Sequence, residues 1–144
     1  MSFTPTYIIV HHSATDPRAS AEDIKKVHLE RGMDDIGYHY LINPEGIILE
    51  GRPISIVGAH ARGLNQHSIG ICCIGDYSFE QPSHAMLSSL KQLVGSLKLR
   101  FAILPAHIIG HRDVITIAPD ATPTACPGDA LYAYLADLRD VCVA

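Results

Sequence analysis

The sequence predicts an α/β fold: a single domain over residues 1–144, in which a central mixed β-sheet is flanked by helices on both faces. Segments rich in β-branched residues alternate irregularly with segments of helical periodicity, as in sheets covered by helices. Two strand-like segments are separated only by a turn sequence, which predicts an antiparallel hairpin within the sheet. The length of 144 residues and a hydrophobic content of 47% are sufficient for one core.

The chain begins with a predicted strand and a predicted helix. Residues 7–12 are nearly all apolar and mostly β-branched before two histidines, which favours a central strand. Ser20 and Asp23 have the spacing of a capping box, so we expect a helix from Ser20 to about Arg31, where Gly32 ends it.

The middle of the chain predicts a hairpin and a second buried strand. Strands are expected at residues 38–42 and 47–51, because the turn sequence Asn43-Pro44-Glu45-Gly46 lies between them. Residues 68–75 form another apolar run of strand length.

Two helices and a short strand are expected in the remainder. A long helix starts at Pro82 and keeps its apolar residues on one face, namely Met86, Leu90, Leu93, Leu97 and Phe101. A short strand is expected at residues 106–109. The last helix starts at Pro127, a favoured first helical position, with an apolar stripe of Leu131, Tyr134, Leu135, Leu138 and Val141 or Cys142.

Composition argues against several classes of partner. The formal net charge of −4 argues against a nucleic-acid groove, and no apolar run is long enough to span a membrane. The N-terminus has neither a basic region nor an apolar core, so we expect synthesis in the cytoplasm without a signal peptide. A monomer is expected.

Three of the four cysteines have the context of buried structural residues. Cys72 and Cys73 are neighbours in a predicted strand, so they point to opposite faces, and Cys142 lies at the end of the last predicted helix. Cys126 precedes Pro127 and hence the start of that helix. The exposed amides at a helix N-terminus favour a thiolate, which is the form that binds zinc.

Histidines near the ends of two strands complete a candidate metal site. Strand alternation allows only one of His11 and His12 to face a given side, and His107 competes with His111 on spacing alone. Two imidazoles and a thiolate would give zinc three protein ligands and leave the fourth position free for water, as in hydrolytic zinc sites.

The ordered set of motifs resembles the N-acetylmuramoyl-L-alanine amidases of the phage-lysozyme type and the related peptidoglycan recognition proteins. The motifs run through nearly the whole chain and are Gly37–Ile42, Glu50–Pro53, Gly58–Ala61, Ser68–Ile71, Gly110–Asp113 and Thr124–Tyr132. The resemblance implies a Zn²⁺ cofactor, peptidoglycan or muropeptide as substrate, and cleavage between the lactyl group of N-acetylmuramic acid and L-alanine.

The resemblance also implies roles for individual residues. The implied zinc ligands are His11, His111 and Cys126, which leaves His12 and His107 as non-ligands. Tyr38 is the implied catalytic tyrosine. The second catalytic position lies two residues before the cysteine, where phage lysozymes carry lysine and this chain has Thr124, as active peptidoglycan recognition proteins do.

A glycine-bounded loop is the expected substrate-binding segment. In the resembling family this loop contributes to the glycan–peptide groove, so His60, Arg62 and Asn65 are expected to bind substrate. His28 is expected to be a core histidine. His39 is expected to be structural and to point to the sheet face opposite Tyr38.

Two alternatives to an enzyme stay open. One is a non-catalytic peptidoglycan-binding module, although such relatives typically lack the cysteine ligand. The other is a phage-type regulator that binds a host protein. An enzyme without a signal peptide is expected to act either on the cell wall after release or on imported wall fragments in the cytoplasm.

Overall fold

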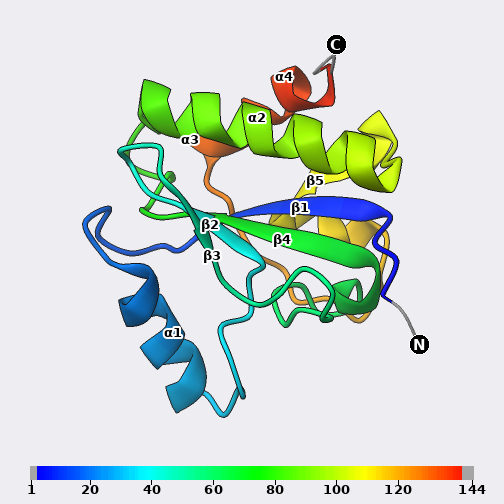
Figure 1. Cartoon of the computed structure of the whole chain (residues 1–144), viewed down its shortest axis with the longest axis horizontal. Coiled ribbons are helices and arrows are strands. Elements are labelled where there is room, and N and C mark those ends of the chain that lie inside the picture. Colours follow the sequence, from blue (N-terminus) through cyan, green and yellow to red (C-terminus); the bar gives the residue numbers. More distant parts are fainter. Residues whose placement is uncertain (1–2, 141–144) are drawn as a thin grey trace.

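The fold is built on a five-stranded mixed sheet with the strand order β3-β2-β4-β1-β5 (Figure 1). It is described here from a computed structural model that covers residues 3–140. The central strand β1 (Tyr7–His12) pairs in parallel with β4 (Ser68–Cys73) and with β5 (Ile108–Gly110). On the far side of β4, the strand β2 (Tyr40–Ile42) is parallel to β4 and antiparallel to β3 (Ile48–Glu50).

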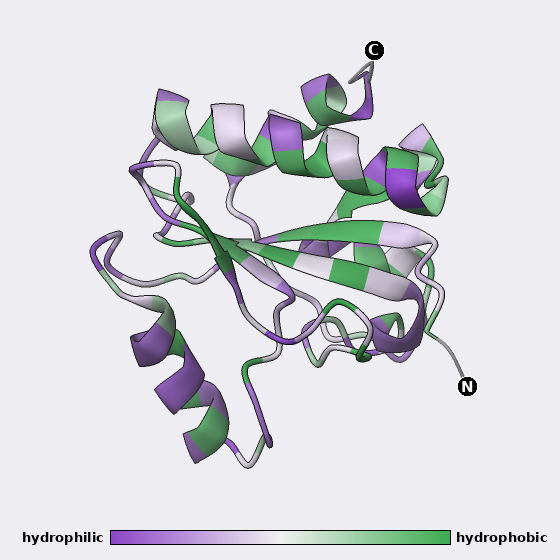
Figure 2. Cartoon of the chain, in the orientation of Figure 1, coloured by the Kyte–Doolittle hydropathy of each residue, from purple (hydrophilic) through white to green (hydrophobic). Residues whose placement is uncertain are grey.

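Helices cover both faces of this sheet, which confirms the predicted fold class. The long helix α2 (His84–Phe101) lies over one face with the short helices α3 (Asp129–Tyr132) and α4 (Leu135–Arg139). The helix α1 (Ala21–Glu30) packs on the other face. Figure 2 shows that the strands are mostly hydrophobic, whereas hydrophobic and hydrophilic residues alternate along the helices.

Alternation along β4 divides the core between the two faces. Cys73 belongs to the cluster beneath α2, whereas Cys72 belongs to the cluster beneath α1. Both cysteines are completely buried, as the sequence predicts. A third cluster, around Ile9 and Ile109, lies under the 3-10 helix that follows β5 at His111–Thr116.

The helix starts and the hairpin turn follow local capping chemistry. Ser20 Oγ accepts from the Asp23 amide and Asp23 Oδ2 accepts from the Ser20 amide, each at 3.0 Å, so the predicted capping box is present. The long helix begins two residues later than predicted because Ser83 serves as its N-cap. The hairpin strands are shorter than predicted, and Asn43 Oδ1 accepts from the Ile47 amide at 2.9 Å in the turn.

Two elements near the C-terminus differ from the prediction. The strand expected at 106–109 starts only at Ile108, because Pro105–His107 forms a 3-10 turn first. The single helix expected from Pro127 starts only at Asp129, and it is divided into the two short helices α3 and α4. Gly128 has a φ of +88° and so cannot be helical, and a side chain at this position would lie 2.3 Å from the backbone of Tyr77. The predicted positions Val141 and Cys142 lie outside the described residues.

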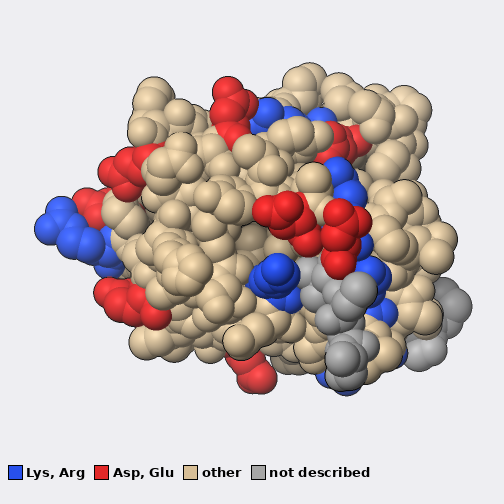
Figure 3. Space-filling view, turned by 90° about the horizontal axis from the view of Figure 1, so that it is seen from above, with Lys and Arg blue, Asp and Glu red and all other residues tan. Residues whose placement is uncertain are grey.

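The surface seen from above the sheet carries acidic and basic side chains in mixed order, separated by uncharged areas (Figure 3). Among residues 3–140, no helix combines the length and the apolar character that crossing a bilayer requires.

Candidate metal centre

Two histidines are brought together by the register of neighbouring parallel strands. Val10 of β1 is the register partner of Gly110 of β5, so His11 and His111 follow side by side at the carboxyl ends of these strands. Their ring centroids are 4.6 Å apart. Parallel pairing of distant segments therefore places two imidazoles at one edge of the sheet.

Cys126 lies at the same edge of the sheet, on a loop that Arg112 holds in position by hydrogen bonds. The Arg112 amide donates to the Cys126 carbonyl at 2.8 Å, and its guanidinium donates to the Ala125 carbonyl and to Asp129 Oδ1. The Cys126 amide donates to Thr124 Oγ1 at 3.1 Å. These contacts fix the loop on both sides of the sulfur, so Thr124 has a local structural contact in addition to its expected catalytic role.

The donor atoms of His11, His111 and Cys126 are spaced to share one ion. All three lie within 4.8 Å of one another, and Cys126 Sγ is 3.8 Å from His11 Nδ1. Tetrahedral zinc with bonds of about 2.0 Å to nitrogen and about 2.3 Å to sulfur would separate such a pair by about 3.5 Å. Two imidazoles and a sulfur are ligands that zinc prefers, so the residues present fit this metal.

His60 contacts the second nitrogen of His11. His60 Nδ1 lies 2.8 Å from His11 Nε2, so His11 Nδ1 is the nitrogen that faces the Cys126 sulfur. The His60 ring packs so close to β4 that a side chain at Gly70 would lie 2.6 Å from it. A histidine that ligates a metal usually needs such a partner to fix its orientation.

Burial controls the protonation of this cluster. It lowers the pKa of His11 well below the ordinary value and that of His60 to about 3, so both rings are neutral at neutral pH. Burial also raises the pKa of the Cys126 thiol to about 12. The expectation of a thiolate stabilised by a helix N-terminus is therefore wrong for the metal-free site. Helix α3 starts only at Asp129, and desolvation of the sulfur outweighs the donors around it.

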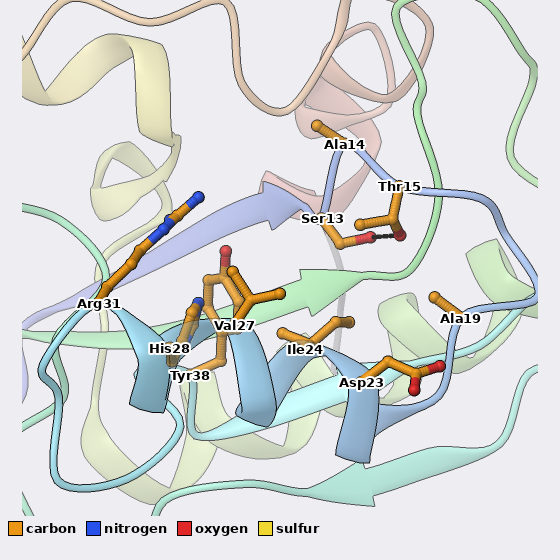
Figure 4. Close-up of a pocket in the computed structure, with 10 residues that line it drawn as sticks. All are labelled: Ser13, Ala14, Thr15, Ala19, Asp23, Ile24, Val27, His28, Arg31 and Tyr38. Atoms are coloured by element: carbon orange, nitrogen blue, oxygen red, sulfur yellow. Dashed lines mark hydrogen bonds between the residues drawn. The ribbon is translucent and has the colours of Figure 1, made fainter.

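Tyr38 lies between the histidine cluster and a cavity. Its ring is 5.0 Å from the His11 ring and 5.3 Å from the His28 ring. Burial raises the pKa of Tyr38 well above its ordinary value, and the neighbouring Cys72 side chain acts in the same direction, so the hydroxyl keeps its proton at neutral pH. The cavity has a volume of about 320 Å³ and lies between α1 and the loop after β1, and in Figure 4 the Tyr38 hydroxyl points between Arg31 and Ser13.

The histidines expected to be non-ligands have other partners. His12 Nδ1 accepts from the Tyr77 amide at 3.1 Å, and His107 stacks on Tyr7 and lies 2.9 Å from the Thr6 carbonyl. Within the part of the chain that the structure describes, the His11–His111–Cys126 group is the only cluster of three His, Cys, Asp or Glu donors spaced for an ion.

His28 and His39 are both structural, but the predicted orientation of His39 is wrong. His28 is buried and accepts from the Gly37 amide at 2.9 Å. His39 lies between the Ile56 carbonyl and the Gly70 amide, and its ring is 5.9 Å from that of His60. Strand β2 starts only at Tyr40, so the alternation that was expected to turn His39 away from Tyr38 and the site does not apply.

In the expected substrate-binding loop, one of the three predicted side chains is exposed and the other two form hydrogen bonds within the protein. Arg62 is exposed. Asn65 Oδ1 accepts from the amides of His60 and Ala61 at 2.8 Å each, so this side chain holds the loop, and His60 contacts His11. Contacts of these three residues with substrate stay a prediction.

Two residues near the centre had no role predicted from the sequence, namely Arg112, which holds the cysteine loop, and Ser68. Ser68 is a completely buried polar residue at the start of an otherwise apolar strand. A buried polar side chain needs a hydrogen-bond partner, and that requirement is the signal that could have singled out Ser68.

Comparison with known proteins places this geometry in a family. The family model described as N-acetylmuramoyl-L-alanine amidase matches residues 2–129, and the chain belongs to this family. It is 37% identical to peptidoglycan-recognition protein LB of Drosophila melanogaster, over 90% of this chain and 57% of that protein. It is 35% identical to the endolysin of Enterobacteria phage T3, over 86% of this chain and 81% of that protein.

A solved endolysin amidase shares the fold. The N-acetylmuramoyl-L-alanine amidase LysCS from Clostridium intestinale superposes with a TM-score of 0.80 and 32% identity, covering 89% of this chain and 78% of that one. The chain spans less than two thirds of the length of the Drosophila relative and 22% of the length of a Sus scrofa N-acetylmuramoyl-L-alanine amidase.

The buried histidines predict that acid destabilises the zinc-free protein. Burial lowers the pKa of His11, His28, His39 and His60, whereas an unfolded chain titrates them near 6.5. Stability present above about pH 6.5 is therefore lost as the pH falls toward the folded-state values, because the unfolded state binds more protons. The free energy of unfolding should fall by at most about 1.4 kcal/mol per pH unit for each histidine. Urea unfolding at a series of pH values from about 8 to about 5 measures this free energy. A free energy of unfolding that does not change with pH would contradict this account.

Proposed function

We propose that this protein is a zinc-dependent N-acetylmuramoyl-L-alanine amidase, and that residues 1–144 form its catalytic domain. The reaction is hydrolysis of the amide between the lactyl group of N-acetylmuramic acid and the L-alanine of the stem peptide. The observation that carries the proposal is the cluster of His11, His111 and Cys126, whose donor atoms lie within 4.8 Å of one another. Family membership supports the choice of substrate.

The three ligands leave one tetrahedral position for water or substrate, as hydrolytic zinc sites require. Zinc bound there would supply Lewis-acid chemistry, lowering the pKa of a water molecule and polarising the amide carbonyl. The buried side chains of His11 and Cys126 exclude bulk solvent from one side of the centre. This low-dielectric surrounding strengthens the electrostatic interactions made in the site.

Tyr38 is the residue that we assign to stabilisation of the oxyanion. Its hydroxyl remains protonated and so can donate a hydrogen bond to the negative oxygen that develops when water adds to the amide. The adjoining cavity of about 320 Å³ is the proposed site for part of the substrate. Arg62, exposed on the loop of His60 and Asn65, is the proposed substrate contact of that loop.

Removing the metal should abolish hydrolysis reversibly. Dialysis against a strong zinc chelator is expected to reduce the release of stem peptides from purified muropeptides to background, and one equivalent of Zn²⁺ is expected to restore it. Mass spectrometry must show a free lactyl carboxyl group on one product and a free L-alanine amino group on the other. Full activity after proof of complete zinc removal would contradict the proposal.

The same assay separates the two alternatives. A non-catalytic peptidoglycan-binding module would retain sacculi in a sedimentation assay without releasing peptides, at any zinc concentration. A regulator that binds a host protein would show neither property. Comparing intact sacculi with small wall fragments as substrates distinguishes action on the cell wall from action on imported fragments.

A further inference from the structure

Ser68 lies between the Leu64 carbonyl and His60, and His60 in turn contacts the metal ligand His11. Its hydroxyl lies 2.7 Å from the Leu64 carbonyl oxygen and 3.3 Å from His60 Nε2. The other nitrogen of His60 lies 2.8 Å from His11 Nε2. We propose that Ser68 is a positioning residue that, through His60, fixes the tautomer of His11 in which Nδ1 is free to bind the metal. This inference rests on the proposed zinc site.

The Leu64 carbonyl sets the direction of the first hydrogen bond. A carbonyl oxygen can only accept, so the single hydroxyl hydrogen of Ser68 is donated to Leu64. The Ser68 hydroxyl can therefore only accept a hydrogen bond from His60. The hydrogen of the His60 ring therefore resides on Nε2 and is donated to Ser68 Oγ.

The position of the hydrogen on His60 determines the position of the hydrogen on the metal ligand His11. A neutral imidazole with its hydrogen on Nε2 has a lone pair on Nδ1, so His60 accepts from His11 Nε2. His11 thus carries its hydrogen on Nε2 and has a lone pair on Nδ1, the atom that lies 3.8 Å from the Cys126 sulfur. The reverse order would put a hydrogen on His11 Nδ1 and block it as a ligand.

The surrounding backbone holds this chain of hydrogen bonds in place. The His60 amide is bonded to Asn65 Oδ1 at 2.8 Å, and its ring lies where only a glycine at position 70 leaves room. Ser68 is completely buried, so water does not compete for its hydroxyl. The tautomer is consequently set before any metal binds.

Nitrogen NMR of the imidazole rings tests the hydrogen positions directly. In the zinc-free wild-type protein, we expect His60 and His11 both to carry their hydrogen on Nε2. A His60 hydrogen on Nδ1 would overturn the proposal. Because the metal is absent from this measurement, its outcome is separate from the question of whether the wild-type protein binds zinc, on which the proposed function depends.

Zinc affinity provides a second test. Loss of an outer-shell partner typically lowers metal affinity by about 10–100-fold, so in chelator competition Ser68→Ala should bind zinc about tenfold more weakly, and His60→Ala more weakly still. Ser68→Thr, which keeps a hydroxyl, should recover most of the loss. Ser89→Ala removes a hydroxyl that donates to the Gly46 carbonyl far from the centre, and it should leave the affinity unchanged.

Unfolding of the zinc-free variants distinguishes positioning from general stability. If Ser68→Ala folds like Ser89→Ala and binds zinc within twofold of wild type, Ser68 has no positioning role. If Ser68→Ala does not fold, the tautomers measured in the wild-type protein still decide the proposal.

Discussion

Replacing Cys126 by serine is expected to abolish stoichiometric zinc binding together with amide hydrolysis. The sulfur is the only soft donor of the three, and a serine hydroxyl does not ionise near neutral pH to replace it. The loss should exceed the roughly 10–100-fold reduction in affinity that results from losing an outer-shell partner. Metal analysis after gel filtration and chelator competition measure the binding, and muropeptide release measures the activity.

Cys73→Ala is the matched control for this substitution. Cys73 is also completely buried, but it points into the core beneath α2 and takes no part in the cluster. This variant should lose some stability while it retains one zinc ion and its activity. If Cys126→Ser held zinc as tightly as wild type, the assignment of the metal centre would be wrong.

Replacing Tyr38 by phenylalanine is expected to lower kcat by about 10²–10³-fold, or about 3–4 kcal/mol, with zinc affinity unchanged. The ring would keep its packing between His11 and His28, so only the hydroxyl is removed. In its proposed role the Tyr38 hydroxyl binds the substrate oxygen only as charge develops, so kcat and kcat/KM should fall together. Steady-state kinetics on a defined muropeptide, with zinc content determined on the same sample, provide the measurement.

Tyr40→Phe controls for the loss of a tyrosine hydroxyl from the same segment. Tyr40 lies two residues further along in β2 and packs against the core beneath α2. Its phenylalanine variant should retain wild-type kinetics. Unaltered kcat in Tyr38→Phe would remove Tyr38 from the mechanism and leave the zinc site itself untouched.

The elements that local chemistry decides could be predicted from the sequence. The capping box of Ser20 and Asp23 and the turn after Asn43 depend on residues a few positions apart, and both are present. The apolar character of β1 and β4 predicted buried strands correctly. Boundaries were missed where distant contacts compete with local preference, as at Gly128, which packs against the backbone of Tyr77.

The candidate site divides in the same way. Alternation correctly separated His11 from His12, and the resemblance supplied His111 and Cys126, which the structure brings together. The role of His60 could not be predicted in the same manner, because its contact with His11 joins residues 49 positions apart. The thiolate expected for Cys126 in the metal-free site was wrong, because burial, a property of the folded chain, raises the pKa of the thiol and outweighs its position before a helix.

The sequence by itself determined which side chains are available for chemistry and which strands and helices carry them, because residue type and short-range periodicity reside in the chain. Only the tertiary structure decided the pairing of β1 with β5, the clamp that Arg112 forms on the cysteine loop and the order of hydrogen bonds from Leu64 to His11. Those features depend on distances and on exclusion of water, and both arise only when segments far apart in the sequence pack against one another.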